Sequence, residues 1–453
     1  MEQRENKMGY MPMGKLLVGM AWPIMLSMLV QALYNVVDSI YVSRLGENGL
    51  TALSLAFPVQ NLIIAVGVGT AVGVNSLLSR KLGERRYDDA NAVAENGLLL
   101  AVLSWLIFLV FGLFFTRTFF MSFTSNTEII EMGTQYLSIC TILSVGIFVS
   151  VVTERIMQAT GKTIYTMFTQ GSGAIINIVL DPILIFGLLG FPAMGIAGAA
   201  IATVIGQLFG MLLSLYLNAK FDKEIHIRLK GFRPNGRIIG EIYAVGVPGI
   251  VMQSISSVMT VGLNKILIDF TETAVAVFGV YFKLQSFVFM PVFGLTNALV
   301  PIVGYNYGAG NRERIVKAIK LAGCYAFGIM TVGAAIFFLF PDKLLLMFDA
   351  SPDMLEIGIP ALRTICISFM GASIGITLSS AFQAMGKGIY SLSMSACRQL
   401  VVILPVAWIL GKLWGLSAVW FAFLIAEVAS LALALILYRR IYNRQIKNLG
   451  AVQ

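Results

Sequence analysis

The sequence predicts an all-α membrane protein whose twelve transmembrane helices form two parallel six-helix lobes. Three observations support this: the composition, the alternation of basic residues between loops, and an internal repeat. Of the 453 residues, 58% are hydrophobic and 12% are charged, and the mean hydropathy is +0.84. Because soluble proteins carry about 25% charged residues, the chain is expected to cross a bilayer many times.

Hydropathy divides the chain into twelve apolar segments, each long enough to cross a bilayer with some tilt. They are predicted at 14–42, 51–79, 92–116, 132–156, 163–187, 193–218, 238–268, 273–303, 314–340, 357–382, 389–411 and 416–438. An even number of spans places both termini on the same side of the membrane.

Lysine and arginine concentrate in every second connecting segment, including the N-terminal segment, the stretch 219–237 and the C-terminal tail. The alternate loops hold only Arg44, Arg117, Lys265, Lys343 and Lys412. By the positive-inside rule the basic segments and both termini are cytoplasmic, in the plasma (inner) membrane of a prokaryotic cell. The net charge of +9 comes from these loops and requires no nucleic-acid partner.

The chain repeats itself with a shift of 225 residues. Pro23 then falls on Pro248, and the Gln-Ala-x-Gly-Lys run at 158–162 falls on the run at 383–387. Because each copy holds six helices, both copies enter the membrane from the same side, which makes them parallel repeats.

The repeat predicts three parts: an N-lobe over 1–218, a cytoplasmic linker over 219–237 and a C-lobe over 238–453. Two six-helix lobes that face a central cavity are typical of a transporter that works by alternating access.

The apolar segment 163–187 contains Asn177 and Asp181, which a helix places one turn apart on the same face. An acid at bilayer depth costs about 2.5–3.5 kcal/mol on insertion scales. Asp181 is therefore expected to be protonated, to hold a cation or to face water. The alternatives are a hydrogen bond that packs two helices, or a position close enough to the interface to be wet.

A second acid, Asp38, lies six residues before Arg44, as Asp181 lies six residues before Gly187. Both acids are therefore expected at the same depth near the outer end of the membrane. With Asn177 they could hold a sodium ion or share a proton. Thr203, in the sixth span, adds a hydroxyl, although a lone threonine usually makes a hydrogen bond between helices.

Four further charged residues fall inside predicted spans. Glu154 is next to Arg155 near the inner end of its span, which predicts either a solvated interfacial pair or a relay or gate. Lys283, Arg398 and Glu427 are expected to pair with each other or with backbone groups, because buried charges are usually paired.

The second lobe lacks the two acids of the first. Leu263 takes the place of Asp38 under the shift, and the stretch around Leu404 that matches Asp181 holds no carboxylate. The ion site is therefore predicted in the N-lobe alone. Polar residues predicted to line the substrate cavity are Gln31, Tyr34, Asn35, Gln60, Lys283 and Gln285.

Several classes of function are excluded by what the sequence holds. The one histidine, His226, lies in the charged linker, so no histidine-based zinc or catalytic site is expected. The four cysteines lie in apolar segments without CxxC spacing and are expected to be free, packed thiols. The run Gly161-Lys162-Thr163 lacks the leading glycine of a P-loop. We therefore expect no enzymatic activity and no cofactor, with transport coupled to an ion gradient.

Three motifs together resemble the multidrug and toxic compound extrusion (MATE) family of the MOP superfamily. They are the run Tyr34–Asp38 closed by Arg44-Leu45-Gly46, the repeated Gln-Ala-x-Gly-Lys, and Asn177-x-x-x-Asp181-Pro182. The resemblance covers nearly the whole chain and implies an antiporter that exports cationic or amphipathic drugs in exchange for Na⁺ or H⁺.

The resemblance also implies which residues act. A cation site would use Asp38, Asn177, Asp181 and Thr203, with Na⁺ on the first three if transport is sodium-coupled, and Glu154 would be the acid of the fourth helix. The expected partners are small-molecule substrates and the lipid bilayer, with the protein a monomer. One group of the family carries further acids on helices 7, 8 and 10, which are absent from the interior of these helices here.

Two other functions would require residues of a different kind. A lipid or lipid-linked oligosaccharide flippase of the same superfamily would be expected to line its cavity with several basic residues, whereas the candidates here are Lys283 and Arg398. A membrane-embedded transferase would need a cluster of acids at the interface, and the sequence holds none.

Overall fold

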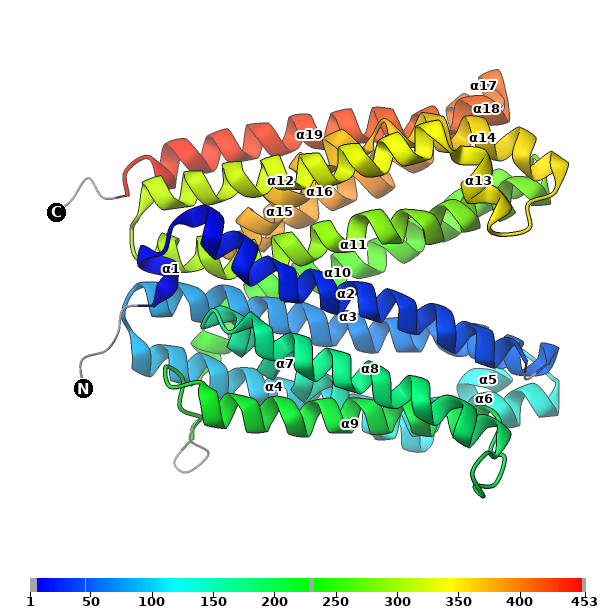
Figure 1. The fold of residues 1–453 in the computed structure, drawn as a ribbon, viewed down its shortest axis with the longest axis horizontal. Helices are drawn as coiled ribbons and strands as arrows, with labels where there is room; N and C mark the ends of the chain where they lie inside the picture. Colours follow the sequence, from blue (N-terminus) through cyan, green and yellow to red (C-terminus); the bar gives the residue numbers. More distant parts are fainter. Residues whose placement is uncertain (1–5, 45, 228–231, 450–453) are drawn as a thin grey trace. The chain divides into compact units, whose positions relative to one another are not determined.

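The computed structural model describes residues 6–44, 46–227 and 232–449, with the side chains at 35, 36, 38–40, 42 and 43 left outside this description. Within these residues every regular element is a helix (Figure 1). Ten helical segments are long and apolar enough to cross a membrane, and two bent helix pairs raise the number to twelve if each pair is one span. The predicted all-helical, polytopic fold is confirmed.

The helices follow the predicted spans, with several short additional elements. In the first half they are α1 (Lys7–Tyr10), α2 (Met13–Ser43), α3 (Glu47–Gly83), α4 (Tyr87–Phe114), α5 (Thr116–Met121), α6 (Thr127–Ile142), α7 (Val145–Ala159), α8 (Thr163–Phe186) and α9 (Ile196–Phe221). In the second half they are α10 (Gly236–Ile268), α11 (Glu272–Gly308), α12 (Arg312–Leu339), α13 (Pro341–Leu346), α14 (Pro352–Cys366), α15 (Phe369–Ala384), α16 (Gly388–Ala396), the π-helix η1 (Cys397–Ile403), α17 (Leu404–Trp414), α18 (Leu416–Val419), α19 (Phe421–Ile441) and the π-helix η2 (Tyr442–Ile446).

The sequence repeat is also a structural repeat. Helices α3, α4 and α5 have the same bounds as α11, α12 and α13 once 225 is added to each residue number. Both halves also contain a bent pair at the same place, α6 with α7 at 41° and α14 with α15 at 49°. The bends divide two of the predicted spans, which hydropathy alone did not indicate.

The chain forms two compact units. The N-unit comprises residues 26–250, and the C-unit comprises residues 1–25 together with 251–453. The first part of α2 therefore belongs to the C-unit, and the first part of α10 belongs to the N-unit. The two division points are themselves 225 residues apart. These bounds differ from the predicted lobes, which assigned each whole helix to the half of the sequence that contains it.

Glycines let these two exchanged helix parts pack closely, the first part of α2 in the C-unit and the first part of α10 in the N-unit. In the N-unit, a Cβ on Gly69 of α3 would lie 2.5 Å from Ile250 Cγ1 and 2.8 Å from the Ile250 nitrogen of α10. In the C-unit, a Cβ on Gly294 of α11 would lie 2.7 Å from Met25 Cα of α2. Gly294 follows Gly69 by 225 residues and Ile250 follows Met25 by the same number, so the same contact occurs in both units.

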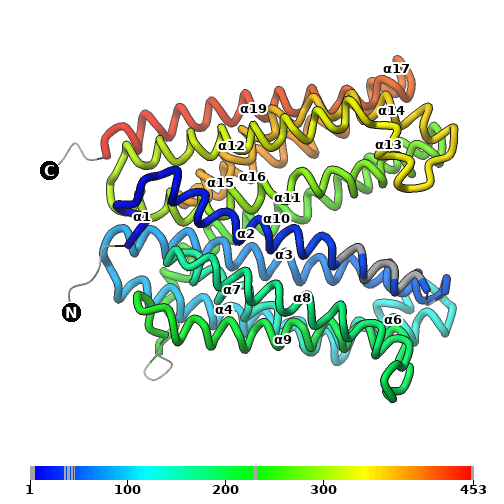
Figure 2. The backbone as a smooth tube through the Cα atoms, viewed as in Figure 1, coloured from blue at the N-terminus to red at the C-terminus, as the bar shows by residue number. Residues whose placement is uncertain are grey.

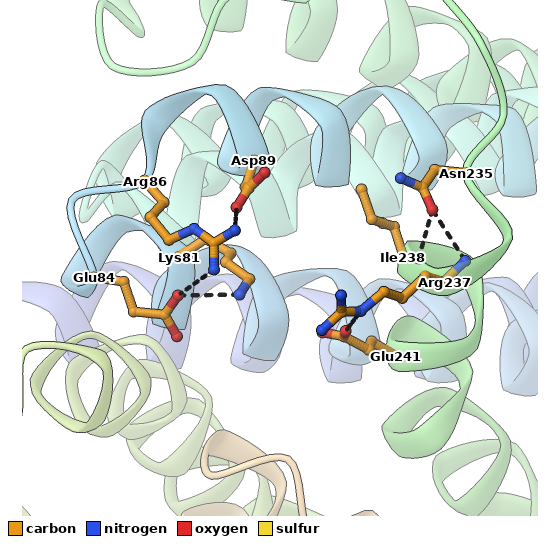
Figure 3. A network of polar contacts seen from close by, with 8 residues as sticks. All are labelled: Lys81, Glu84, Arg86, Asp89, Asn235, Arg237, Ile238 and Glu241. Carbon is orange, nitrogen blue, oxygen red and sulfur yellow. Dashed lines mark hydrogen bonds and ion pairs between the residues drawn. The ribbon is translucent and has the colours of Figure 1, made fainter.

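The start of α10 is held to the N-unit by asparagines. Asn235 precedes the helix, and its Oδ1 accepts hydrogen bonds from the backbone nitrogens of Arg237 (3.0 Å) and Ile238 (3.3 Å), as Figure 3 shows. Its own backbone nitrogen donates to Asn96 Oδ1 of α4 at 3.0 Å. This arrangement satisfies donors that the helix start leaves unpaired, which is the role of an N-cap.

Several ion pairs lie at the same end of the N-unit. Lys81 pairs with Glu84 at 3.0 Å and Arg237 pairs with Glu241 at 3.2 Å, while Arg86 pairs with Asp89 (Figure 3). These side chains are partly exposed, and exposed pairs are worth only about 0–1 kcal/mol each. The cap and the helix packing therefore contribute more to the position of α10.

The start of α2 is held to the C-unit by an arginine. Arg314 of α12 donates to the backbone oxygens of Met8 at 2.9 Å and Met11 at 2.8 Å. Asn306 Nδ2, at the end of α11, also donates to the Met8 oxygen, at 3.1 Å. Hydrogen bonds of asparagines thus hold the first part of α10, whereas Arg314 and an asparagine hold the chain at the start of α2.

Candidate functional site

Helices α8 and α9 lie side by side in the N-unit (Figure 2) and approach closely because glycines face each other. A Cβ on Gly173 would lie 3.0 Å from the Gly206 oxygen, and one on Gly206 would lie 2.6 Å from the Gly173 oxygen. Small residues of this kind let helix backbones approach within a membrane. The close approach brings Asn177 of α8 next to Thr203 of α9.

Asn177, Asp181 and Thr203 form one hydrogen-bonded group. Asp181 is 0% exposed and Asn177 is 3% exposed, so both are buried within an apolar helix pair. The amide of Asn177 is assigned so that its nitrogen donates to Asp181 Oδ2 at 2.8 Å and its oxygen accepts from the Thr203 nitrogen at 3.0 Å and hydroxyl at 3.1 Å.

This group has the chemistry of a small cation or proton site. Carboxylate, amide and hydroxyl oxygens are the ligands that hard cations prefer. With its nitrogen toward Asp181, the Asn177 amide supports the carboxylate without a cation. Rotated by half a turn, it would present its oxygen beside the carboxylate as a further ligand. The alternatives are a proton on Asp181 or a purely structural hydrogen bond.

Two of the predicted site residues cannot be placed. The side chains of Asp38 and Asn35 lie outside the described residues, although both positions belong to α2. Their proximity to Asp181 therefore stays a prediction.

Glu154 of α7 forms a second buried group with α8. Its Oε1 accepts from the Thr169 hydroxyl and its Oε2 accepts from Gln170 Nε2, each at 2.7 Å. Glu154 is 5% exposed. Arg155 turns instead to Gln158, at 2.9 Å. The predicted solvated pair of Glu154 with Arg155 is therefore wrong, because α8 supplies two neutral donors that satisfy the carboxylate inside the N-unit.

Sequence reasoning missed Thr169 and Gln170. A signal was available, since Thr166, Thr169 and Gln170 are polar at helical spacing within a span that otherwise reads as apolar. Glu154 thus contacts α8 at Thr169, twelve residues before Asp181 on the same helix. Twelve residues correspond to about 18 Å along a helix, which keeps the two groups at different depths.

In the described residues of the C-unit, Arg398 and Glu427 form a largely buried ion pair. Arg398 Nη1 of η1 lies 3.5 Å from Glu427 Oε2 of α19, and the Glu427 side chain is 8% exposed. The other oxygen, Glu427 Oε1, has no hydrogen-bond partner within the described residues. Charge-assisted hydrogen bonds are normally about 2.7–2.9 Å long, so this pair is held loosely. Lys283, by contrast, is exposed and pairs with no carboxylate of the described chain.

The predicted cavity residues come from both units. In the N-unit, Gln60 Nε2 donates to the Tyr136 hydroxyl at 2.7 Å. Gln31 and Tyr34 follow on the second part of α2, while Lys283 and Gln285 belong to α11 of the C-unit. Because each unit is described by itself, a cavity shared by these residues stays a prediction.

The chain matches a family model and several characterised relatives. The MatE family model matches residues 23–183 and again 248–409, in agreement with the internal repeat. The multidrug export protein MepA of Staphylococcus haemolyticus is 27% identical over 432 residues, which cover 95% of this chain and 94% of that protein.

Solved structures also match over almost the whole chain. An outward-facing multidrug resistance MATE family transporter of the MOP superfamily has a TM-score of 0.92 at 28% identity, with 99% of each chain covered. A MOP superfamily transporter from Pyrococcus furiosus, whose binding pocket of reverse polarity points to a different function, has a TM-score of 0.90 at 28% identity and the same coverage.

Proposed function

This chain belongs to the MatE family, and on this premise we propose that it exports cationic and amphipathic drugs in exchange for Na⁺ or H⁺. Multidrug export is the function named for its relative MepA, and the structural likeness to a multidrug resistance transporter extends over the entire fold. The protein is a multidrug efflux antiporter of the cell membrane. We also propose which residues form its coupling site and which ions can drive it.

The coupling site is assigned to Asp181 with Asn177 and Thr203, completed by Asp38. The observation that carries this assignment is the complete burial of an acid inside an apolar helix pair, with Asn177 turned toward it at 2.8 Å. Such acids are rare in membranes and commonly serve ion or proton pathways. Binding of Na⁺ or H⁺ would neutralise the carboxylate charge, and its release would restore it.

We propose that the protein works as a monomer without cofactor, converts no substrate chemically, and keeps both termini in the cytoplasm. The orientation is tested with cysteines introduced into the 219–237 stretch, which should react with a membrane-impermeant thiol reagent from the cytoplasmic side. Reaction from the outside would overturn the orientation.

The flippase alternative is less well supported by the charges of the described chain. It was expected to use several basic residues in the cavity, and Arg398 is paired with Glu427. Of the two basic candidates, Lys283 and Arg398, only Lys283 has no carboxylate partner among the described residues. Predicted cavity residues with so little positive charge suit a cationic substrate better than a pyrophosphate.

The decisive experiment measures efflux of a cationic dye from vesicles under Na⁺ and H⁺ gradients imposed separately. We expect efflux under one or both gradients, and none when an ionophore collapses them. Efflux that persists without any ion gradient would contradict antiport. Comparison of the two gradients identifies the ion, and loss of the response in Asp181→Asn connects it to the proposed site.

A further inference from the structure

We propose that the C-unit binds an anionic phospholipid, with an acyl chain in a groove between α12, α15 and α19 and the phosphate at Lys320. The groove has a volume of about 430 Å³. Its lining residues are Ile319, Lys320, Gly323, Cys324, Phe327, Ile374, Thr377, Leu378, Leu435 and Tyr438. Seven of these side chains are hydrocarbon, glycine or thiol, so an apolar occupant fits the groove wall.

The position of the groove along the membrane determines which part of a lipid it meets. Lys320 lies eight residues after the start of α12, about 12 Å along the helix. Its side chain is exposed and can extend toward the membrane surface, as long basic side chains do near helix ends. The apolar groove below it then lies at the depth of acyl chains.

Positive charge gathers at this end of the C-unit. The ends of α12 and α19 lie together, because the guanidinium of Arg312 lies over the Tyr442 ring with 5.4 Å to its centroid. The exposed charged residues of these two ends are five basic ones and one acid: Arg312, Lys317, Lys320, Arg439, Arg440 and Glu313. Basic pockets between helices on the cytoplasmic side favour anionic lipid head groups, at about 1 kcal/mol for each lysine or arginine. Charge therefore selects an anionic head group over a zwitterionic one.

The corresponding positions of the N-unit differ in charge and in size. Under the 225-residue shift, Glu95 takes the place of Lys320 and Leu98 takes the place of Gly323. An acid would repel an anionic head group, and a leucine would occupy space that the glycine leaves open. These two residues thus distinguish the C-unit groove from the matching N-unit positions, a difference that a general covering of the protein by lipid would not require.

Cys324 gives a probe inside the groove. The prediction that all four cysteines are packed is wrong for this residue: Cys140 and Cys366 are buried, whereas Cys324 is exposed on α12. A fluorescent bimane would be attached to Cys324 in a variant whose other three cysteines are alanine. The labelled protein would be placed in phosphatidylcholine vesicles that contain increasing fractions of brominated phosphatidylglycerol or brominated phosphatidylcholine.

We expect brominated phosphatidylglycerol to quench the label at about one fifth of the fraction that brominated phosphatidylcholine requires, since about 1 kcal/mol corresponds to roughly fivefold in affinity. The matched control places the label at Gly328→Cys with Cys324→Ala, one turn further along α12, where a Cβ meets nothing within 4 Å. This control should respond equally to both lipids.

Two variants separate charge from shape. Lys320→Gln should remove the preference for phosphatidylglycerol at Cys324. Gly323→Leu, at a position where a Cβ meets nothing within 4 Å, should fill the groove and weaken quenching by both lipids. Equal quenching by the two lipids in the unsubstituted protein, or a preference that survives Lys320→Gln, would overturn the proposal. Displacement of brominated phosphatidylcholine by a cationic dye, without any preference for phosphatidylglycerol, would instead make the groove an entry for substrates.

Discussion

Helix α8 of the N-unit runs without a break from Thr163 to Phe186 and carries Asn177 and Asp181, whereas its counterpart in the C-unit is divided into α16, η1 and α17. The π-helical turn η1 lies in the segment between Tyr390 and Pro405, which is two residues shorter than the matching segment of the N-unit. It carries Arg398 and no acid. The C-unit acid, Glu427, comes from α19 and faces that arginine.

The difference teaches that the repeat preserves most helix bounds and the crossing at Gly69 and Gly294, but neither the continuity of α8 nor its charged groups. In the N-unit an acid is supported by neutral donors, which leaves its charge available to a mobile cation. In the C-unit a tethered guanidinium already provides a positive charge to the acid. The comparison therefore favours one ion-coupling unit and one unit with an internal ion pair, and each of the following predictions tests part of it.

The largest effect is expected for Asp181→Asn, which removes the charge that a coupling ion would neutralise. Efflux driven by an ion gradient should fall to the level of vesicles without the protein, while the variant still reaches the membrane. Asp38→Asn should behave in the same way. The measurement is dye efflux under imposed Na⁺ and H⁺ gradients, with binding of Na⁺ measured separately.

The matched control for this prediction is Glu427→Gln in the other unit. It should retain the coupling ratio between ion and substrate, even if it reduces the amount of folded protein. A normal coupling ratio in Asp181→Asn, or its loss in Glu427→Gln alone, would reverse the assignment of roles to the two units.

The next effect concerns the shared crossings. Gly69→Ala and Gly294→Ala each place a Cβ less than 3 Å from the backbone of the exchanged helix part. Overpacking of this kind costs about 1–3 kcal/mol, and the two variants should be destabilised alike if the crossings are equivalent. Thermal unfolding in detergent measures the cost. Gly328→Ala, which meets nothing within 4 Å, serves as control. A normal melting temperature in one variant alone would show that the crossings differ.

A smaller effect is expected from the C-unit ion pair. Removal of one buried partner leaves the other charge uncompensated, and complete burial would cost about 3–5 kcal/mol. Arg398 retains 26% exposure and the pair is 3.5 Å apart, so we expect about 1–2 kcal/mol for Arg398→Met or Glu427→Gln. The double variant should recover most of the loss. Additive losses in the double variant would mean that the two charges do not interact.

The smallest effect is expected at the start of α10. Asn235→Ala removes the side-chain cap and should cost about 1 kcal/mol. Asn235→Ser should recover most of it, because serine is an equally good cap. A loss that serine does not recover would show that the Asn235 side chain does not act as the cap, since the hydrogen bond to Asn96 comes from the backbone nitrogen and is kept in both variants.

The spans and the repeat could be predicted because hydropathy and glycine and proline positions are properties of short stretches. The bent pairs were not predicted, because no proline stands at the breaks Leu143-Ser144 and Ile367-Ser368, and glycines such as Gly146 and Gly371, which follow them, also occur within unbroken helices of this chain. The exchange of helix parts between the units could not be predicted either, since apolar residues of α2 and α10 fit any neighbouring helix.

The candidate site was predictable where a residue is rare in its surroundings. Asp181 and Asn177 are conspicuous within an apolar segment, and their burial together with Thr203 agrees with the spacing. Of the two readings of Glu154, the solvated pair with Arg155 was wrong, because the partners of Glu154 lie across on α8 at Thr169 and Gln170, and the relay or gate stays a prediction. Partners on another helix depend on helix packing, which residue spacing within one segment does not reveal.

The exchanged helix parts also set an order for biosynthesis. The N-unit is complete once the ribosome has made residue 250, so it can assemble while the rest of the chain is still being translated. The C-unit needs both ends of the chain. Met25 packs against Gly294, which is synthesised roughly 270 residues later. At about 5–20 residues per second, translation of this stretch takes about 15–50 s. During that interval the start of α2 lacks its partner, so a helix that is made early is among the last to finish packing.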